Sequence, residues 1–201
     1  MSSPTSVPRS EFILGGQRSG KSRRAETLAQ HWLQADAQHH AVMVATARIW
    51  DEEMRLRIAR HQADRTERVP GMHTVEEPLA LAAAVSRLSQ PDTLVVVDCL
   101  TLWLTNLLMP LFDSQYPTDQ AQAETAALAT EPIRALLCAI EQAPGPVVIV
   151  GNEIGMGVIP MGAQVRAFVD QLGRLNQDMA RVCSRVTLMA AGLALTLKDT
   201  P

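Results

Sequence analysis

The chain has 201 residues, of which 47% are hydrophobic and 3% aromatic, and its formal net charge is −3 at pH 7. This length suits one domain with a sizeable core, and the charge and the few aromatic rings argue against a nucleic-acid-binding surface. No apolar run reaches the roughly 20 residues that a membrane helix needs, so we expect no membrane insertion.

The cysteines and the N-terminal segment indicate where the protein works. Cys99, Cys138 and Cys183 are scattered without metal-binding or redox spacing, which favours a reducing compartment. Residues 1–10 are polar, contain proline and lack the hydrophobic core of a signal peptide. We therefore expect a cytoplasmic protein with a disordered lead-in over residues 1–10 and a single catalytic domain over residues 11–201.

The most informative stretch is the motif Gly15-x-x-x-x-Gly20-Lys21-Ser22, with an apolar run before it and a helical pattern after it. In this strand–loop–helix context the motif predicts a phosphate-binding loop, whose backbone N–H groups and helix N-terminus hold phosphate oxygens. The alternative is a glycine-rich turn that only caps a helix. The predicted nucleotide-binding residues of this loop are Gly15, Gly16, Gln17, Arg18, Ser19, Gly20, Lys21 and Ser22.

The next elements alternate between strands and helices. Residues 41–45 predict a buried strand, and Asp51 caps a following helix with an apolar face that includes His61. The remaining expected elements are a loop over 64–71, a helix over 79–88, a strand over 94–98, a helix over 101–108, a loop over 110–118, a helix over 122–142, a strand over 146–150, a turn over 151–157, a helix over 163–182, and a pair of strands over 186–190 and 193–197.

This alternation predicts an α/β fold of the P-loop NTPase (RecA-like) type, with a mostly parallel central sheet flanked by helices and a C-terminal strand pair. Ligands bind beyond the carboxyl ends of the strands in such sheets. Besides the phosphate loop, the polar residues expected at that edge are Thr46, Asp98, Asn152 and Glu153.

Asp98 ends an apolar strand and is a candidate ligand of Mg²⁺ together with the hydroxyl of Ser22. The alternative is a carboxylate that caps the next turn. Thr101 and Asn106 follow on the next predicted helix, where they either line the ligand cleft or serve as structural caps.

An arginine-rich helix precedes His61. It is either a solvated surface helix with ion pairs such as Glu53–Arg57, or an anion-binding site in which His61 carries a proton or acts as a nucleophile.

Six segments in this order resemble one family: GGQRSGKS, TARIWDEEMRLRIARH, TVEEPLAL, VVVDCLTLWLTNLL, VIVGNEIGMGVIP and GRLNQDMARVCSRVTLMAAGLALTLK. The chain is similar to the bifunctional adenosylcobinamide kinase / adenosylcobinamide-phosphate guanylyltransferases of cobalamin biosynthesis. The other readings of the phosphate loop are a simple small-molecule kinase and a nucleotide-dependent switch or binding module.

The resemblance implies that ATP or GTP phosphorylates the aminopropanol arm of adenosylcobinamide, and that GMP then passes from GTP to the new phosphate through a covalent GMP–histidine intermediate at His61. It also implies Mg²⁺ and a homo-oligomer, a trimer. Glu76 is the candidate for recognising guanine. The family often has arginine where this chain has Gln62, and tryptophan where it has Met72. The further nucleotide contacts implied are Ala45, Thr46, Ala47, Gln62, Ala63, Asp64, Arg65, Glu76 and Asp98.

Overall fold

The computed structural model describes residues 7–49, 51–108, 119–158 and 160–200, and within these ranges it leaves aside the side chains of Arg57, His61 and residues 119–128. The loop expected over 110–118 and the first six residues of the expected lead-in lie outside the described residues. Val7 is described and packs against the hydrophobic cluster that contains Ile13 and Leu28, and the first strand begins at Ser10.

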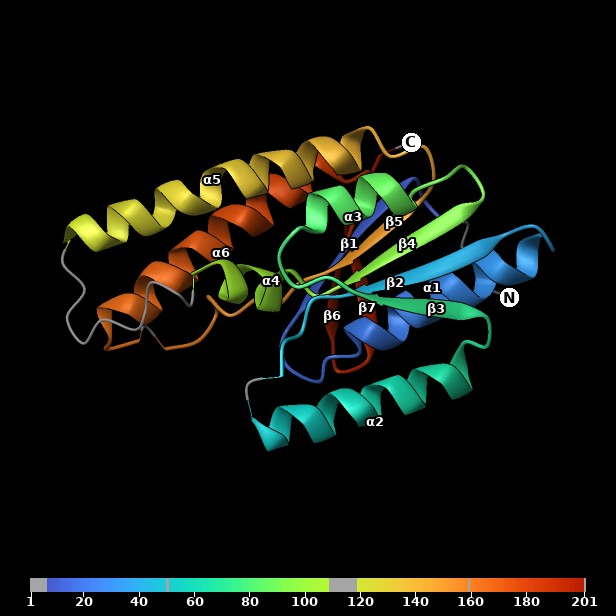
Figure 1. The fold of residues 1–201 in the computed structure, drawn as a ribbon, viewed down its shortest axis with the longest axis horizontal. Helices are drawn as coiled ribbons and strands as arrows, with labels where there is room; N and C mark the ends of the chain where they lie inside the picture. Colours follow the sequence, from blue (N-terminus) through green and yellow to red (C-terminus); the bar gives the residue numbers. More distant parts are fainter. Residues whose placement is uncertain (1–6, 50, 109–118, 159, 201) are drawn as a thin grey trace.

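Seven strands form one sheet in the described part of the chain, in the order β3-β2-β4-β5-β1-β6-β7 (Figure 1). Neighbouring strands pair in parallel except β6 and β7, which form an antiparallel pair. The strands are β1 (Ser10–Gly15), β2 (His40–Ala45), β3 (Met72–Glu76), β4 (Thr93–Asp98), β5 (Val147–Val150), β6 (Arg185–Ala190) and β7 (Leu193–Asp199).

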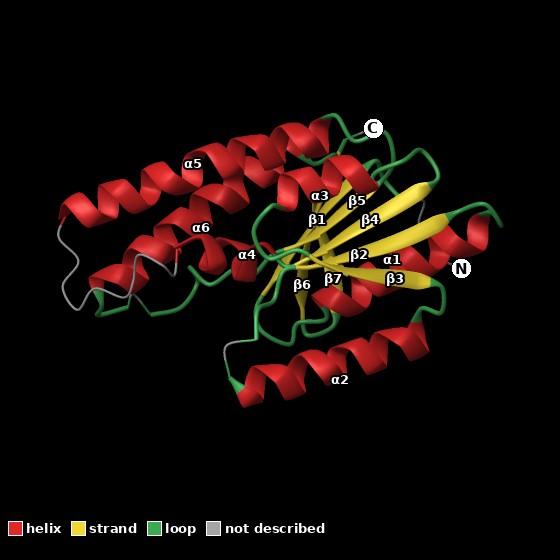
Figure 2. Cartoon of the chain, in the orientation of Figure 1, coloured by secondary structure: helices red, strands yellow, loops and turns green. Residues whose placement is uncertain are grey.

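Helices cover both faces of this sheet (Figure 2). They are α1 (Lys21–Ala35), α2 (Glu52–Arg68), α3 (Leu81–Leu88), α4 (Leu100–Leu108), α5 (Asp119–Glu141) and α6 (Ala163–Val182). The predicted α/β class, the mostly parallel sheet and the C-terminal strand pair are therefore confirmed. Helices α3, α4, α5 and α6 begin and end within three residues of the expected positions, because their apolar periodicity is strong.

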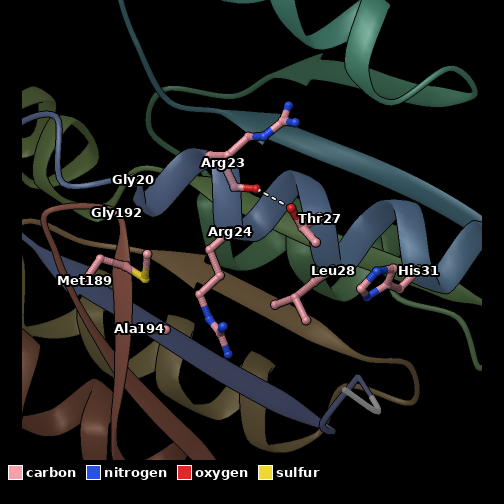
Figure 3. Close-up of a pocket in the computed structure, with 9 residues that line it drawn as sticks. All are labelled: Gly20, Arg23, Arg24, Thr27, Leu28, His31, Met189, Gly192 and Ala194. Atoms are coloured by element: carbon pink, nitrogen blue, oxygen red, sulfur yellow. Dashed lines mark hydrogen bonds between the residues drawn. The ribbon is translucent and has the colours of Figure 1, made fainter. Parts of the chain in front are cut away.

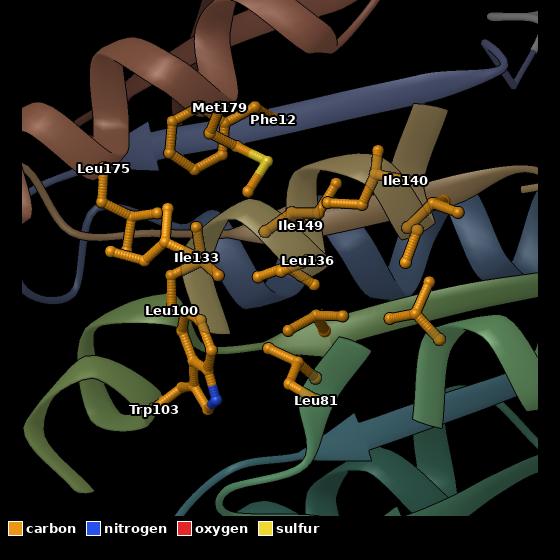
Figure 4. Close-up of a cluster of buried hydrophobic side chains, with 14 of the residues drawn as sticks. Phe12, Leu81, Leu100, Trp103, Ile133, Leu136, Ile140, Ile149, Leu175 and Met179 are labelled. Carbon is orange, nitrogen blue, oxygen red and sulfur yellow. The ribbon is translucent and has the colours of Figure 1, made fainter. Parts of the chain in front are cut away.

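The core has two parts because the central strands are apolar on both sides, as buried parallel strands usually are. On one face, Phe12 and Ile149 pack with α3, α4, α5 and α6 (Figure 4). On the other face, Ile13 and Val96 pack against α1. This sandwich holds the carboxyl ends of β1, β4 and β5 side by side.

Two predictions about the second quarter of the chain are wrong. The loop expected over 64–71 is helical up to Arg68, where the N–H of Val69 closes the last turn on the carbonyl of Arg65. Arginine and glutamate are good helix formers, so the polar composition there does not interrupt the helix. The strand β3 was not expected, because it is an edge strand whose residues are half-buried or exposed and so give little apolar alternation.

Candidate active site

The loop between β1 and α1 has the shape that a phosphate-binding loop needs. Gly15 has φ +155°, and a Cβ atom there would lie 2.5 Å from both the Met189 carbonyl oxygen and the Ser19 hydroxyl. Gly20 has φ +103° and forms the N-cap of α1 without a capping side chain. The N–H of Gly192 donates to the Ser19 carbonyl at 3.0 Å, which fixes the loop to the β6–β7 turn. The first N–H groups of α1 therefore remain available to an anion.

Lys21 is held inside this loop. Its Nζ donates to the carbonyl of Gly16 at 2.6 Å, and residues 16–18 are exposed at the apex. Burial lowers the pKa of the Lys21 amine from its ordinary value, while the electrostatic influence of the neighbouring Cys99 and Asp98 acts in the opposite direction. The ammonium is therefore placed where phosphate oxygens can replace a backbone carbonyl as its acceptor.

Ser22 and Asp98 meet as the sequence predicts. The Ser22 hydroxyl donates to Oδ2 of Asp98 at 3.0 Å, although 76 positions separate them. Two oxygen ligands fit Mg²⁺, which is usually held by one or two protein oxygens together with substrate phosphates and water. Among the described residues there is no cluster of three or more His, Cys, Asp or Glu side chains that could hold a metal alone.

Thr46 lies in the turn that follows β2, and it is fully buried. Its hydroxyl donates to the Cys99 carbonyl at 2.8 Å and accepts from the Cys99 N–H at 2.9 Å. The side chain of Asn106 donates to the Thr46 carbonyl at 2.7 Å. These contacts favour a structural role for Asn106. Ala45 and Ala47, which flank Thr46 in this hydrogen-bonded turn, are half-buried.

The predicted residues of α2 come together with those of β3. Gln62 donates to Oε1 of Glu76 at 3.3 Å, and the buried Arg65 donates to the Thr74 hydroxyl at 3.0 Å. His61 lies in α2 immediately before Gln62 and one helical turn before Arg65. Since Gln62 reaches Glu76, the last residue of β3, position 61 lies toward the carboxyl ends of the strands, as does the phosphate loop after β1.

The end of α2 is tied to the phosphate-loop helix. Arg68 lies 3.4 Å from Asp64 of its own helix and 3.3 Å from the buried Glu26 of α1. Asp64 is thus engaged in an ion pair, and Ala63 is exposed beside it. This bridge links the helix that carries His61 to the helix that begins at Lys21.

The arginine-rich helix shows some of its expected surface pairing. Arg55 Nε donates to Glu52 at 2.7 Å on the exposed side of the first turn. The expected Glu53–Arg57 pair involves a side chain outside the described part. Arg60 is exposed. The first turn of α2 therefore behaves as a solvated helix, while Arg65 is directed toward the sheet.

A second polar cluster joins β5 to its neighbours. The backbone N–H and the side-chain amide of Asn152 both donate to the Thr101 hydroxyl at 3.1 Å. The Glu153 N–H donates to the Gly15 carbonyl at 3.2 Å. Asn176 of α6, which sequence reasoning missed, donates to the Asn152 carbonyl at 3.1 Å. A polar residue between the apolar positions of a buried helix face was the available signal.

A pocket lies between α1 and the β6–β7 hairpin (Figure 3). Gly20 is the only predicted site residue in its lining, and the side chains of Leu28, Met189 and Ala194 make part of it apolar. The Arg24 guanidinium at this pocket binds the buried Glu11 at 2.6 Å. We therefore place the chemistry at the carboxyl edge of the sheet and not in this pocket.

Comparison with known proteins shows the family of the chain. A family model described as "Cobinamide kinase / cobinamide phosphate guanyltransferase" matches residues 11–197. The chain is 42% identical over 191 residues to the "Bifunctional adenosylcobalamin biosynthesis protein CobP" of Pseudomonas aeruginosa, covering 95% of this chain and 98% of the relative. It is 35% identical over 188 residues to the "Bifunctional adenosylcobalamin biosynthesis protein CobU" of Escherichia coli, covering 93% and 98% of the two chains.

Proposed function

The chain belongs to the cobinamide kinase / cobinamide phosphate guanyltransferase family, and we propose that one phosphate loop serves both reactions. The enzyme first phosphorylates adenosylcobinamide with ATP or GTP. It then transfers GMP from GTP to adenosylcobinamide phosphate, which yields adenosyl-GDP-cobinamide and pyrophosphate. The contact that best supports a triphosphate site is the hydrogen bond between Ser22 of the loop and Asp98 at the end of β4.

In the kinase step, the loop N–H groups and Lys21 hold the β- and γ-phosphates in place. The hydroxyl of the aminopropanol arm attacks the γ-phosphorus and loses its proton to solvent, the bond from that phosphorus to the bridging oxygen breaks, and the nucleoside diphosphate leaves. Ser22 and Asp98 are the residues that would hold Mg²⁺. The chemistry supplied by bound Mg²⁺ is neutralisation of the charge on the phosphate oxygens.

In the transfer step, an imidazole nitrogen of His61 attacks the α-phosphorus of GTP, and pyrophosphate leaves with the electron pair of the broken P–O bond. A phosphate oxygen of adenosylcobinamide phosphate then attacks the same phosphorus and displaces the imidazole. The position of His61 in α2, which is bridged to α1 through Arg68 and Glu26, supports this assignment.

We assign guanine recognition to Glu76. Its carboxylate is exposed at the end of β3 and accepts one hydrogen bond, from Gln62 at 3.3 Å, which leaves acceptor capacity for the N1–H and amino group of guanine. Glu76→Gln should then reduce the preference for GTP over ATP in the transfer step. An unchanged preference would refute this role.

We further propose that residues 11–201 act as one catalytic domain in a cytoplasmic homo-oligomer, a trimer. The three cysteines are free, which suits a reducing compartment. Leu193, Leu195 and Leu197 alternate along the edge strand β7 and are all more than half exposed, which supports burial of that strand between copies. No helix in the described ranges is long and apolar enough to span a membrane.

The decisive experiment is incubation with Mg²⁺ and GTP labelled at its α-phosphate, followed by denaturing electrophoresis. We expect an acid-labile, alkali-stable label that is absent from His61→Ala and present in the control His73→Ala, which removes an exposed histidine of β3. No label on folded, active wild-type protein would refute the transfer mechanism and would favour a simple kinase.

Lys21→Ala tests whether the loop is shared. Both kinase turnover and GMP labelling should fall, because both reactions use the same triphosphate-binding loop. Kinase turnover at the wild-type rate in this variant would refute a common loop. If the wild-type protein binds nucleotide but shows no turnover, and Lys21→Ala abolishes that binding, the result would favour a switch or binding module.

A further inference from the structure

The segment that connects β5 to α6 exposes an unusual number of large apolar side chains. Met156, Val158 and Met161 are 80%, 95% and 96% exposed. Ile154 of the same segment and Val165 in the first turn of α6 are also exposed. We call these five residues the β5–α6 patch. Apolar side chains gathered on the surface of one segment are typical of a binding site.

Polar contacts hold the segment at both ends. At its start, the N–H groups of Gly151 and Glu153 donate to carbonyls of β1 at 2.9 and 3.2 Å. At its end, the guanidinium of Arg166 donates to the carbonyls of Pro160 and Met161 at 3.0 and 2.6 Å. Both ends of the segment are therefore anchored while the apolar side chains of the patch face solvent, so a ligand would find part of this surface already ordered.

The segment that carries the patch begins next to the phosphate loop. Strand β5 lies between β4 and β1 in the sheet, so the segment leaves the sheet between Asp98 and the phosphate loop (Figure 1). The hydrogen bond from Glu153 to Gly15 fixes its first residues directly to that loop. A molecule bound to the patch can therefore extend a side arm toward the γ-phosphate.

The chemistry of the segment suits a large ligand whose outer surface carries few charged groups. No charged residue occurs between Glu153 and Arg166. Adenosylcobinamide presents a macrocycle with apolar edges and neutral amide groups, whereas a nucleotide presents phosphates that this stretch does not match with positive charge. Methionine side chains adapt to irregular apolar surfaces, which suits the edge of a corrin ring.

We propose that the β5–α6 patch is the docking surface for the corrinoid ring of adenosylcobinamide, and that it presents the aminopropanol arm to the phosphate loop. This inference rests on the proposed function. It adds a contact surface for the ring to the recognition of the side arm, and it makes the patch a determinant of acceptor affinity and not of nucleotide affinity.

The test compares two double variants. Met156→Gln with Met161→Gln keeps side-chain length and makes the surface polar, while Met156→Leu with Met161→Leu keeps it apolar. Circular dichroism confirms folding, equilibrium dialysis measures adenosylcobinamide binding, and steady-state assays give KM for adenosylcobinamide and for GTP. The glutamine pair should weaken corrinoid binding and raise its KM by about tenfold. The leucine pair should stay near wild type, and KM for GTP and covalent GMP labelling should not change in either.

Corrinoid affinity within twofold of wild type in the folded glutamine pair would overturn the proposal. A change in oligomeric mass with unchanged corrinoid affinity would overturn it too, because the patch would then be an interface between copies. Failure of the transfer mechanism would appear as absent GMP labelling of the wild type. It can be told apart from failure of this proposal, because corrinoid binding is measured by dialysis without any nucleotide.

Discussion

Neutralising Glu11 should destabilise the protein more than any exposed charge change. Glu11 is fully buried in β1, where Oε1 lies 2.6 Å from Nε of Arg24 and accepts from the Thr187 hydroxyl at 2.8 Å. Arg185 lies 3.9 Å from Oε2, but it also binds Asp199 at 3.0 Å. Glu11→Gln keeps the shape and leaves the mostly buried Arg24 without its carboxylate.

Removing one partner of a buried ion pair typically costs about 3–5 kcal/mol, and partial exposure of Arg24 puts this site at the lower end, about 3 kcal/mol. For a chain of this size, that loss corresponds to a decrease in Tm of roughly 10 °C. Arg24 lies in the helix that begins at Lys21, so we also expect weaker GTP binding.

Urea unfolding followed by circular dichroism measures the free energy of unfolding. The matched control is Glu131→Gln, which removes a carboxylate that lies 2.8 Å from Arg134 on the surface of α5 and should leave stability unchanged. A second variant, Glu11→Met with Arg24→Met, should recover most of the loss, because well-packed apolar side chains can replace a buried pair. A loss for Glu11→Gln no larger than that of Glu131→Gln would refute the reasoning.

Three further predictions follow from the site and the core. Gly15→Ala should abolish both kinase turnover and GMP labelling in assays of folded protein, because the added Cβ would meet a backbone carbonyl at 2.5 Å; retained turnover would contradict the loop geometry. Asn106→Ala should lower the free energy of unfolding in urea by about 2 kcal/mol, because it leaves two backbone carbonyls without their donor; weaker GTP binding at unchanged stability would instead indicate a residue of the cleft. Burial raises the pKa of the Cys99 and Cys183 thiols from 9.0 to about 11 and about 12, so iodoacetamide at pH 8 should label only the exposed Cys138 in mass spectra of folded protein. Rapid labelling of all three thiols would refute the burial of Cys99 and Cys183. The same pKa shifts stabilise the folded state fully below pH about 9, and thermal melts should show this contribution lost as the pH rises through about 11 and 12.

Local patterns predicted most of the secondary structure because the relevant interactions are local. The helix at residues 163–182 and the N-cap at Asp51, which accepts from the N–H of Met54 at 2.7 Å, were both expected from residues close in sequence. The edge strand β3 was missed because its stability comes from pairing with β2 and not from its own apolar pattern. The end of α2 was misplaced for a different reason, since the polar residues there suggested a loop although arginine and glutamate are good helix formers.

Site residues divide in the same way. The phosphate loop and Asp98 are recognisable because a short motif and a strand end carry the required chemistry. Asn176 was not recognisable, because its role depends on α6 packing beside the turn after β5. Thr46 and Asn106 were candidates for the cleft, yet the structure engages both with buried backbone groups.

The sequence by itself determined the phosphate loop, the α/β class and the family to which the chain belongs, because spacing and residue type specify them. Only the tertiary structure decided that Gln62 meets Glu76, and that the segment after β5 leaves the sheet between Asp98 and the loop with its apolar side chains exposed. These contacts join residues far apart along the chain, and they follow from the strand order of the sheet, which no local pattern specifies.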